Sequence, residues 1–520
     1  MNTPARVPAF VPVVVVGAGP TGITAATLLA QYGIQTLVLD RWQDVYPQPR
    51  AVHADDEVYR ILAQLGVRDE FAAISRPGLG LRLLAPNMAV LAEIRRDPQT
   101  SVHGFPQANM YDQPELEAVL RANLKNYPAA IFQGNAEVTD ITRTGPDRVR
   151  VSFTDRVKGD EHVVESAYVL GCDGANSLAR RAIGASMQDL KFQQRWLVID
   201  VDTTAQLDQW EGVHQVCNPV RAATYMRVGD TRYRWEFQLL ENETAADYQT
   251  LTGILPLISP WLGDIAAERL QLVRVGEYMF RAQVANRWRD GNVFILGDAA
   301  HLTPPFIGQG LCAGLRDAMN LAWKLAGVLD NTLPESVLDT YEQERKPHVR
   351  RMIRLAVRVG WAMTAGGRFG NLFRRVLVPW LERRTGTRSK ALTSATPPLS
   401  ESALVIKSHR PKQLAGTLCP NPIVADGSRF DDAVGNRFAV VTFSPLTDSQ
   451  RDEVNRRGAV AIVAAAGGEL DRWLHAAGDC GAIVRPDRTV MQDGRNMDSL
   501  CEALPPFPTS ASTPGANPTL

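Results

Sequence analysis

Three glycines near the N-terminus have the spacing of a dinucleotide-binding turn. Together they form a G-x-G-x-x-G motif, made by Gly17, Gly19 and Gly22. The motif lies between an apolar, β-branched run at residues 11–16 and a helical segment, which is the context such a turn requires. The first glycine permits the tight turn, the second lets the backbone approach a pyrophosphate, and the third lets helix and strand pack closely. We expect Pro20 and Thr21 at the same site, where the helix N-terminus faces the phosphates.

An acidic residue ends the next predicted strand. Asp40 directly follows the apolar run at residues 35–39. A carboxylate at this place would accept hydrogen bonds from the ribose hydroxyls of an adenosine and would repel a 2′-phosphate. The pair of motifs therefore favours FAD or NAD over NADP, and the neighbouring Arg41 is included in the expected cofactor site.

Two further motifs separate FAD from NAD. One reads G-C-D-G-A-N-S-x-x-R over residues 171–180, and the other reads G-D-A-A-H-x-x-P-P-x-x-G-Q-G over residues 297–310. In order and spacing, the three motifs resemble those of the group A flavoprotein aromatic monooxygenases, which have the fold of para-hydroxybenzoate hydroxylase. Within that family the chain is most similar to the 3-(3-hydroxyphenyl)propionate hydroxylase and phenol hydroxylase branch, from about Val13 to about His348.

The resemblance implies a flavin site built from the third motif. In the family its aspartate, here Asp298, binds the ribityl chain, and a carboxylate at a strand end can accept hydrogen bonds from those hydroxyls. The turn that follows brings backbone against the isoalloxazine ring, and the start of the next helix stabilises negative charge on the reduced flavin. The residues of this turn and helix start are Pro305, Gly308, Gly310 and Leu311.

Three more residues match cofactor-binding positions of the family. Asp173 serves both FAD and the nicotinamide cofactor there, while Arg50 and Gln113 match residues near the flavin; the alternatives are a surface arginine and a polar residue at a helix start. Because the sequence has no second G-x-G-x-x-G fingerprint, NADH or NADPH is expected to bind transiently, and the choice between them stays open. Asn176 stands where arginine is common and Cys312 where some relatives carry asparagine, so neither is given a role.

The resemblance also implies the reaction. Reduced nicotinamide passes hydride to FAD, reduced flavin and O2 give a C4a-hydroperoxide, and this species hydroxylates a phenolic or other aromatic substrate. The protein must hold the ring, exclude water and help a substrate hydroxyl to lose its proton. His53, close to Arg50, is the candidate for this proton transfer; the alternative is a solvent-facing or structural histidine.

Other candidates come from the segment expected to cover the substrate. Tyr225 and Arg234 could contact the substrate, although ordinary sheet residues are the favoured interpretation. Arg221, in the run C-N-P-x-R, could meet a substrate carboxylate or lie exposed in a β-turn. His301 is of a residue type that often acts in catalysis, but in the family it belongs to a structural turn.

The order of apolar runs predicts a mixed α/β, multidomain (α+β) fold. Buried-strand patterns on both sides of an alternating region indicate a Rossmann-like FAD-binding domain with an inserted antiparallel sheet for the substrate. The C-terminal part resembles the thioredoxin-like domain of the phenol hydroxylases but lacks C-x-x-C. The expected boundaries are 1–185 with 286–345 for the FAD-binding domain, 186–285 for the substrate sheet, 346–395 for a helical connector, 400–505 for the thioredoxin-like domain and 506–520 for a disordered tail.

Composition excludes several classes of protein. Lys plus Arg and Asp plus Glu both number 56, so no basic surface charge draws the chain to nucleic acid. The six cysteines are scattered, as in a reducing, cytoplasmic compartment, and they form no metal cluster with the histidines. Residues 8–39 carry no charge, but their central glycines exclude a membrane span, and no signal peptide is expected. Residues 345–384 fit a packed basic helix better than a membrane-surface helix.

The expected partners are a small aromatic substrate and O2, with a homodimer as an open prospect and no stable membrane association. One alternative is an oxygenase of the same fold that hydroxylates, epoxidises or carries out Baeyer–Villiger oxygenation of a polyketide. A flavin-dependent halogenase is disfavoured, because Trp235 is followed by Glu-Phe and not by the W-x-W-x-I-P signature. A non-catalytic flavin-binding sensor is the alternative from a different class, and the complete set of three motifs argues against it.

Overall fold

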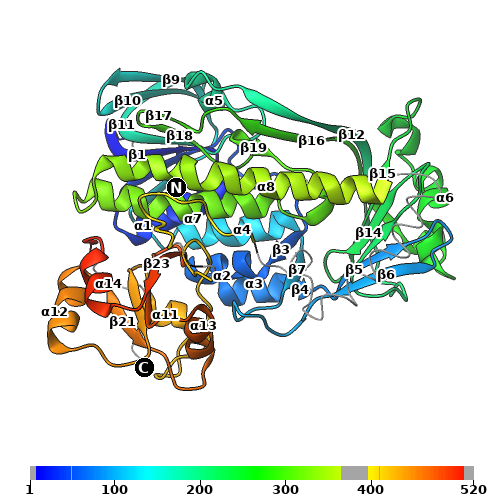
Figure 1. The fold of residues 1–520 in the computed structure, drawn as a ribbon. Helices are drawn as coiled ribbons and strands as arrows, with labels where there is room; N and C mark the ends of the chain where they lie inside the picture. Colours follow the sequence, from blue (N-terminus) through cyan, green and yellow to red (C-terminus); the bar gives the residue numbers. More distant parts are fainter. Residues whose placement is uncertain (1–7, 48–49, 365–395, 409, 411, 509–520) are drawn as a thin grey trace, which may run out of the picture.

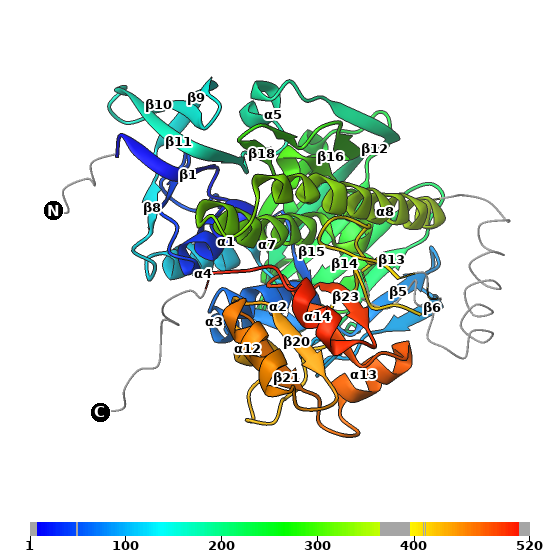
Figure 2. The ribbon, with the colours of Figure 1, turned by 60° about the vertical axis from the view of Figure 1, so that its left-hand side comes forward.

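The structure is a computed structural model, and it describes residues 8–47, 50–364, 396–408, 410 and 412–508. A parallel sheet with its helices lies at one end of the molecule and an antiparallel sheet at the other (Figure 1). Two long strands run between these ends, and a smaller C-terminal module packs below the helices (Figures 1 and 2).

The parallel sheet is built around the N-terminal strand. β1 (Phe10–Val16) lies between β11 (Glu161–Gly171) and β2 (Thr36–Leu39), and all three run parallel. β1 is buried from Val13 to Val16, and a strand covered on both faces must be apolar throughout, which explains its run of valines. The other strands of this sheet are β8 (Ala130–Gln133), β9 (Ala136–Gly145), β10 (Arg148–Asp155), β17 (Arg289–Asp290) and β18 (Val293–Ile295).

Two helices that begin at predicted motifs cross this sheet side by side. α1 (Pro20–Gln31) follows the first glycine motif and α7 (Gly310–Leu329) follows the third. Their close approach depends on Gly314, where a Cβ would lie 2.2 Å from Thr21 Oγ1. The remaining helices of this part are α2 (Asp56–Gln64), α3 (Arg68–Ile74), α4 (Gln113–Leu124) and α5 (Leu178–Ala182).

The antiparallel sheet has eight strands in the order β19-β16-β12-β15-β14-β13-β5-β6, and among these described strands its one parallel pair is β13 with β5. The long strands β12 (Met187–Asp202) and β16 (Gln271–Ala285) connect it to the first part of the molecule (Figure 1). Two strands come from residues 80–95, which lie outside the expected 186–285 range, because β13 pairs with β5 across the domains. The other strands are β5 (Gly80–Leu84), β6 (Val90–Arg95), β13 (Val213–Val216), β14 (Ala223–Arg227), β15 (Arg232–Gln238) and β19 (His301–Leu302).

One face of this sheet is covered by α6 (Leu251–Leu262), which packs on alternate strand residues. A small three-stranded sheet, in the order β3-β7-β4, lies between the two large sheets. Its strands are β3 (His53–Asp55), β4 (Ser75–Pro77) and β7 (Ala108–Tyr111).

The C-terminal module holds a four-stranded sheet in the order β21-β20-β22-β23. β20 runs parallel to β21 and antiparallel to β22, so the sheet is mixed. Its elements are α11 (Phe430–Val434), β20 (Ala439–Thr442), α12 (Asp448–Arg456), β21 (Val460–Val463), α13 (Glu469–Ala477), β22 (Gly481–Val484), β23 (Val490–Gly494) and α14 (Met497–Ala503). The mixed α/β architecture is confirmed, while the likeness of this module to thioredoxin stays a prediction.

The predicted basic helix begins earlier than expected, as α8 (Asp339–Thr364). Most of the expected connector, residues 365–395, and most of the predicted tail, residues 509–520, lie outside the described residues. In the part of the chain that the structure describes, no helix combines the length and the apolar character needed to cross a bilayer.

Candidate active site

A single large cavity collects most of the residues that the sequence singled out. Its volume is about 2300 Å³, and it reaches from the first βα turn past the small sheet to the antiparallel sheet and the C-terminal module. Pockets for one drug-sized ligand measure about 300–1,000 Å³. The cavity is therefore large enough for a dinucleotide together with a second molecule.

The first βα turn fits a pyrophosphate. Gly17 has a φ of 101°, and a Cβ there would lie 2.4 Å from the carbonyl oxygen of Cys172. A Cβ at Gly22 would lie 1.9 Å from the carbonyl oxygen of Gly17, so both positions require glycine to keep the turn closed. Around Gly19, by contrast, a Cβ would meet no atom within 4 Å. This open side of the turn is where a phosphate can approach the backbone and the first amides of α1.

Two acidic residues beside the turn have the chemistry to bind hydroxyl groups. Asp40 accepts hydrogen bonds from the backbone nitrogens of Ala18 (2.6 Å) and Trp42 (2.8 Å), which fix its carboxylate at the cavity wall. Asp173 uses one oxygen to cap α5, accepting from the backbone nitrogens of Leu178 (2.6 Å) and Ala179 (3.0 Å). Its other oxygen, Oδ1, is buried without a partner among the described residues. A ligand hydroxyl that donates a hydrogen bond would satisfy it.

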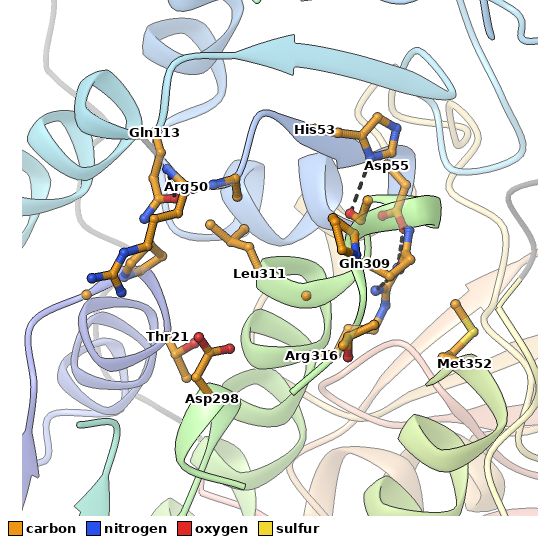
Figure 3. Close-up of a pocket in the computed structure, with 18 of the residues that line it drawn as sticks. Thr21, Arg50, His53, Asp55, Gln113, Asp298, Gln309, Leu311, Arg316 and Met352 are labelled. Carbon is orange, nitrogen blue, oxygen red and sulfur yellow. Dashed lines mark hydrogen bonds and ion pairs between the residues drawn. The ribbon is translucent and has the colours of Figure 1, made fainter. Parts of the chain in front are cut away.

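The third motif lines the cavity beside the first βα turn. Asp298 lies in a 3-10 turn (Gly297–Ala299), and its side chain opens into the cavity near Thr21 (Figure 3). Burial by the surrounding protein raises the pKa of Asp298, while His301 and Arg50 act in the opposite direction. A carboxylate in this setting gains from donor hydroxyls, which is the chemistry of a ribityl chain. The residues with the chemistry to bind FAD therefore extend from the first βα turn to the Asp298 turn.

The turn before α7 brings bare backbone to the cavity. The 3-10 turn Pro305–Ile307 ends at Gly308, whose φ is 64°, and α7 begins two residues later. Leu311 lies on the first turn of α7, between Asp298 and the small sheet (Figure 3). The free amides of the α7 N-terminus face the cavity, where they can stabilise negative charge.

Substitution of Gly308 by alanine tests whether this turn matters. The left-handed backbone costs about 1–2 kcal/mol for a residue with a Cβ, and that Cβ would lie 2.8 Å from His53 Nδ1. We expect Gly308→Ala to fold but to bind FAD about tenfold more weakly, measured by fluorescence titration of the apoprotein. Gly263→Ala is the control, because Gly263 also has a positive φ, of 55°, and its Cβ would meet no atom within 4 Å. Equal affinities in the two variants would contradict the role of the turn.

His53 lies on β3 against this turn. Its Nδ1 is 3.5 Å from the carbonyl oxygen of Gly308, and the ring borders the cavity (Figure 3). Burial lowers the pKa of His53, with Asp55 and the Gly308 carbonyl acting in the opposite direction. The imidazole is therefore neutral at neutral pH and able to accept a proton.

A buried ionic network behind His53 holds the turn in place. Arg316 of α7 pairs with Asp55 and donates from Nε to Glu57 Oε2 at 2.7 Å. Gln309 completes the network, since its amide nitrogen donates to Asp55 Oδ2 at 2.8 Å and its oxygen accepts from Arg316 Nη1 at 2.8 Å. Sequence reasoning missed these residues, because nothing local connects positions 55–57 with α7. The run of three acids at 55–57 was the one available signal.

The Arg50 segment is clamped from two sides. Gln113 Oε1 accepts from the backbone nitrogens of Arg50 (3.2 Å) and Ala51 (2.6 Å), while its amide nitrogen donates to Glu117 (2.7 Å). Arg234 Nη1 donates to the carbonyl oxygen of Arg50 at 2.9 Å. The Arg50 side chain is exposed at the cavity and lies over the ring of Tyr46, 5.3 Å from its centroid. Gln113 thus has its polar groups engaged with protein in this structure.

The structure places the other candidates at different distances from the cavity. Arg41 is exposed at its rim. Arg234 is 1% exposed and forms an ion pair with Asp200 at 2.7 Å, so it lies behind the cavity wall. Tyr225 points to the other face of the sheet, into the core beneath α6. Arg221 pairs with Glu243 outside the cavity lining.

His301 and Cys312 make structural contacts. His301 Nε2 lies 2.7 Å from Asp317 Oδ2, and both side chains are buried behind the Asp298 turn. The Sγ atom of Cys312 lies 3.4 Å from the carbonyl oxygen of Gly308. Among the described residues, no group of three or more His, Cys, Asp and Glu side chains could hold a metal ion.

Comparison with known proteins identifies a matching family and relatives that are named as aromatic hydroxylases. Residues 10–356 match the sequence profile of the family described as "FAD binding domain". A probable NADH-specific resorcinol 4-hydroxylase of Rhodococcus jostii (strain RHA1) is 31% identical, over 97% of both chains. A 3-(3-hydroxy-phenyl)propionate/3-hydroxycinnamic acid hydroxylase of Burkholderia cenocepacia (strain HI2424) is 33% identical, over 82% of this chain and 78% of the relative.

Solved structures share the fold over nearly the whole chain. Aklavinone-11 hydroxylase, solved with FAD and aklavinone, has a TM-score of 0.78 at 22% identity and covers 97% of this chain and 99% of its own. The flavin-dependent monooxygenase PieE, solved with FAD and substrate, has a TM-score of 0.78 at 21% identity, covering 95% of this chain and 98% of its own. The arrangement of both large sheets and of the C-terminal module is thus a known one.

Proposed function

The chain belongs to the family of FAD-dependent aromatic hydroxylases, and we propose that it adds one oxygen atom to a small phenol at the junction of His53 and the Gly308 turn. The observation that carries this proposal is the position of His53. It borders the same cavity as the two cofactor walls and lies beside the turn expected to carry the flavin ring. The antiparallel sheet closes the cavity opposite this turn, which leaves room for an aromatic ring between them.

The cofactor would be held by groups from all three motifs. Gly19 and the start of α1 would hold the pyrophosphate, Asp40 the adenosine ribose, and Asp298 the ribityl chain. When bound, FAD takes hydride from a reduced nicotinamide and activates O2. The unpartnered Asp173 Oδ1 would serve FAD or the nicotinamide cofactor. The Rhodococcus relative named as NADH-specific favours NADH for this chain.

His53 would act on the substrate proton. A phenol becomes more reactive at its ortho and para carbons when its hydroxyl proton is transferred, and a neutral imidazole can accept that proton. The neighbouring Gly308 carbonyl can accept a hydrogen bond from the Nδ1–H group and so leave Nε2 as the proton acceptor. The Asp55–Arg316–Gln309 network would keep the ring and the turn in register.

The direct test is substrate-stimulated oxidation of NADH by the holoenzyme. We would measure it with 1,3-dihydroxybenzene and with 3-(3-hydroxyphenyl)propionate, the substrate types named for the two relatives. The expected result is stimulation by at least one of them and a product heavier by one oxygen atom in mass spectrometry. Hydrogen peroxide as the only oxygen product with every phenol tested would overturn the proposal.

Replacement of His53 by asparagine should lower kcat by about 10²-fold, the usual contribution of a general base. The sign of the pH dependence follows from the lowered pKa of His53. The neutral, proton-accepting form persists below pH 6.5, so the wild-type enzyme should lose activity only at more acidic pH. The pH–rate profile of His53→Asn should lack this loss of activity at acidic pH, with FAD content unchanged. If the variant kept the loss, a group other than His53 would be responsible for it.

The proposal also covers the cellular compartment, the assembly and the role of the C-terminal module. We infer a cytoplasmic protein from the free cysteines, all six of which are unpaired. We infer a homodimer as the assembly to test by light scattering. The C-terminal module, without C-x-x-C, would act in scaffolding or subunit contact and not in disulfide exchange.

A further inference from the structure

One row of polar side chains crosses the cavity-facing side of the antiparallel sheet. Gln215 of β13 pairs in register with Thr224 of β14, which in turn pairs with Glu236 of β15. Their strand neighbours Tyr225 and Trp235 point into the core beneath α6, on the opposite face. Because side chains alternate along a strand, the three polar residues share the face that borders the cavity.

One donor in this row, the Gln215 amide nitrogen, lacks a hydrogen-bond partner among the described residues. Thr224 Oγ1 donates to Gln215 Oε1 at 2.7 Å, which orients the amide. Gln215 is 1% exposed, and its amide nitrogen has no partner among the described residues. Buried amide groups are normally hydrogen-bonded, so this donor is arranged for a ligand acceptor. The Glu236 carboxyl is 9% exposed and borders the cavity.

The cation two residues from Glu236 on β15 is hydrogen-bonded to other groups. Arg234, two residues away on the same face, holds Asp200 through two hydrogen bonds of 2.7 and 3.1 Å and donates to the carbonyl oxygen of Arg50. Burial raises the pKa of Glu236, while Arg234 lowers it and Asp200 raises it further. The carboxyl group can accept a hydrogen bond in either protonation state, and its ionised form repels a second negative charge.

An apolar surface lies beside the row. Val52, Met110 and Met226 form a small buried cluster, with Val213 packed against it, and all four border the cavity. An aromatic ring on this surface would have the polar row at its edge. Methionine side chains also make favourable contacts with ring edges.

We propose that the Gln215–Thr224–Glu236 row binds a hydroxyl group of the substrate and selects uncharged, hydroxylated rings against rings that carry a carboxylate at this position. The proposal rests on the phenol hydroxylation proposed above. The hydroxyl donates to the Glu236 carboxylate and accepts from the Gln215 amide, while Thr224 positions that amide. A carboxylate in the same place would meet the acidic group of Glu236 and would offer it no proton.

The test compares two substrates in the holoenzyme. The wild-type enzyme should show a higher kcat/KM for 1,3-dihydroxybenzene than for 3-(3-hydroxyphenyl)propionate. Glu236→Gln should reduce this ratio by about tenfold, because it removes the like-charge repulsion but keeps the side-chain shape. Gln215→Met, which removes the donor, should weaken binding of the dihydroxybenzene by about tenfold, measured by perturbation of the flavin absorbance.

The control is Glu241→Gln, since Glu241 is an exposed residue of the same part of the chain. It should leave the ratio unchanged. A ratio unaffected by Glu236→Gln, or a wild-type preference for the carboxylate, would overturn this inference while hydroxylation itself stands. Absence of NADH oxidation and of product with both phenols would instead count against the proposed function and, with it, this inference.

Discussion

Glu344→Gln is expected to lower the free energy of unfolding by about 3 kcal/mol, because breaking a buried ion pair leaves uncompensated charge. Glu344 lies on α8 and is fully buried where α7, α8 and the C-terminal module meet. Its carboxylate accepts hydrogen bonds from five donor groups of four residues, two of them on α7 and two in the C-terminal part of the chain. These donors are Lys324 Nζ (2.9 Å), Asn320 Nδ2 (2.8 Å), Ser402 Oγ (2.6 Å), and Nη1 (2.9 Å) and Nη2 (3.0 Å) of Arg485.

The same residue predicts a pH dependence of stability. Burial alone would raise the pKa of Glu344, but Arg485 and Lys324 hold it well below its usual range. A carboxyl group with a depressed folded-state pKa stabilises the protein above its unfolded value of about 4.3 and loses this contribution as pH falls below it. The stability difference between wild type and Glu344→Gln should therefore shrink progressively as pH falls below about 5 towards the depressed folded-state pKa.

Chemical denaturation followed by circular dichroism measures the change in the free energy of unfolding. Limited proteolysis measures whether the C-terminal module detaches from α7 and α8. Asp448→Asn is the matched control, because Asp448 pairs with Arg451 at 94% side-chain exposure. Exposed pairs contribute about 0–1 kcal/mol. If the two variants shifted the denaturation midpoint equally, the buried network would not hold the module in place.

The sequence was sufficient for features that depend on local pattern. The spacing of the glycines at residues 17–22 predicts the turn, and the valine run before it predicts a strand that is covered on both faces. The same holds for the turn before α7, where Gly308 needs its left-handed φ of 64°. These features could be placed because one short segment contains all of their physical requirements.

Features that depend on strand parity and distant pairing were not found. Tyr225 belongs to the segment expected to cover the substrate, with an ordinary sheet residue as the favoured interpretation; its neighbour Thr224 faces the cavity, while Tyr225 faces the core. The alternation of Tyr225, Trp235 and Phe237 with polar residues was the available signal, because an apolar set with a period of two marks the buried face. Nothing local could reveal that Gln113 binds the backbone at Arg50, 63 positions away in the chain.

Asp298→Ala is expected to weaken FAD binding by about 10–100-fold. The Asp298 side chain opens into the cavity beside Thr21 of the first βα turn, and nearby Thr21 and Leu311 offer no second carboxylate (Figure 3). Hydrogen bonds to a charged group contribute about 1.5–3 kcal/mol, and each 1.4 kcal/mol is a factor of ten in affinity. Titration of apoprotein with FAD, followed by quenching of flavin fluorescence, measures the loss.

Two companion variants separate loss of the acceptor from loss of the fold. Asp298→Asn keeps a neutral acceptor oxygen of the same shape, so its affinity should lie between those of wild type and Asp298→Ala. Asp330→Ala removes an exposed carboxylate at the far end of α7 and should bind FAD as wild type does. The Asp298 carboxylate accepts no hydrogen bond from another described residue, so its substitution leaves no such donor unpaired and the thermal stability of the apoprotein should hardly change. Undiminished flavin content in purified Asp298→Ala would mean that the ribityl chain lies elsewhere, and the assignment of the Gly308 turn to the flavin ring would fall with it.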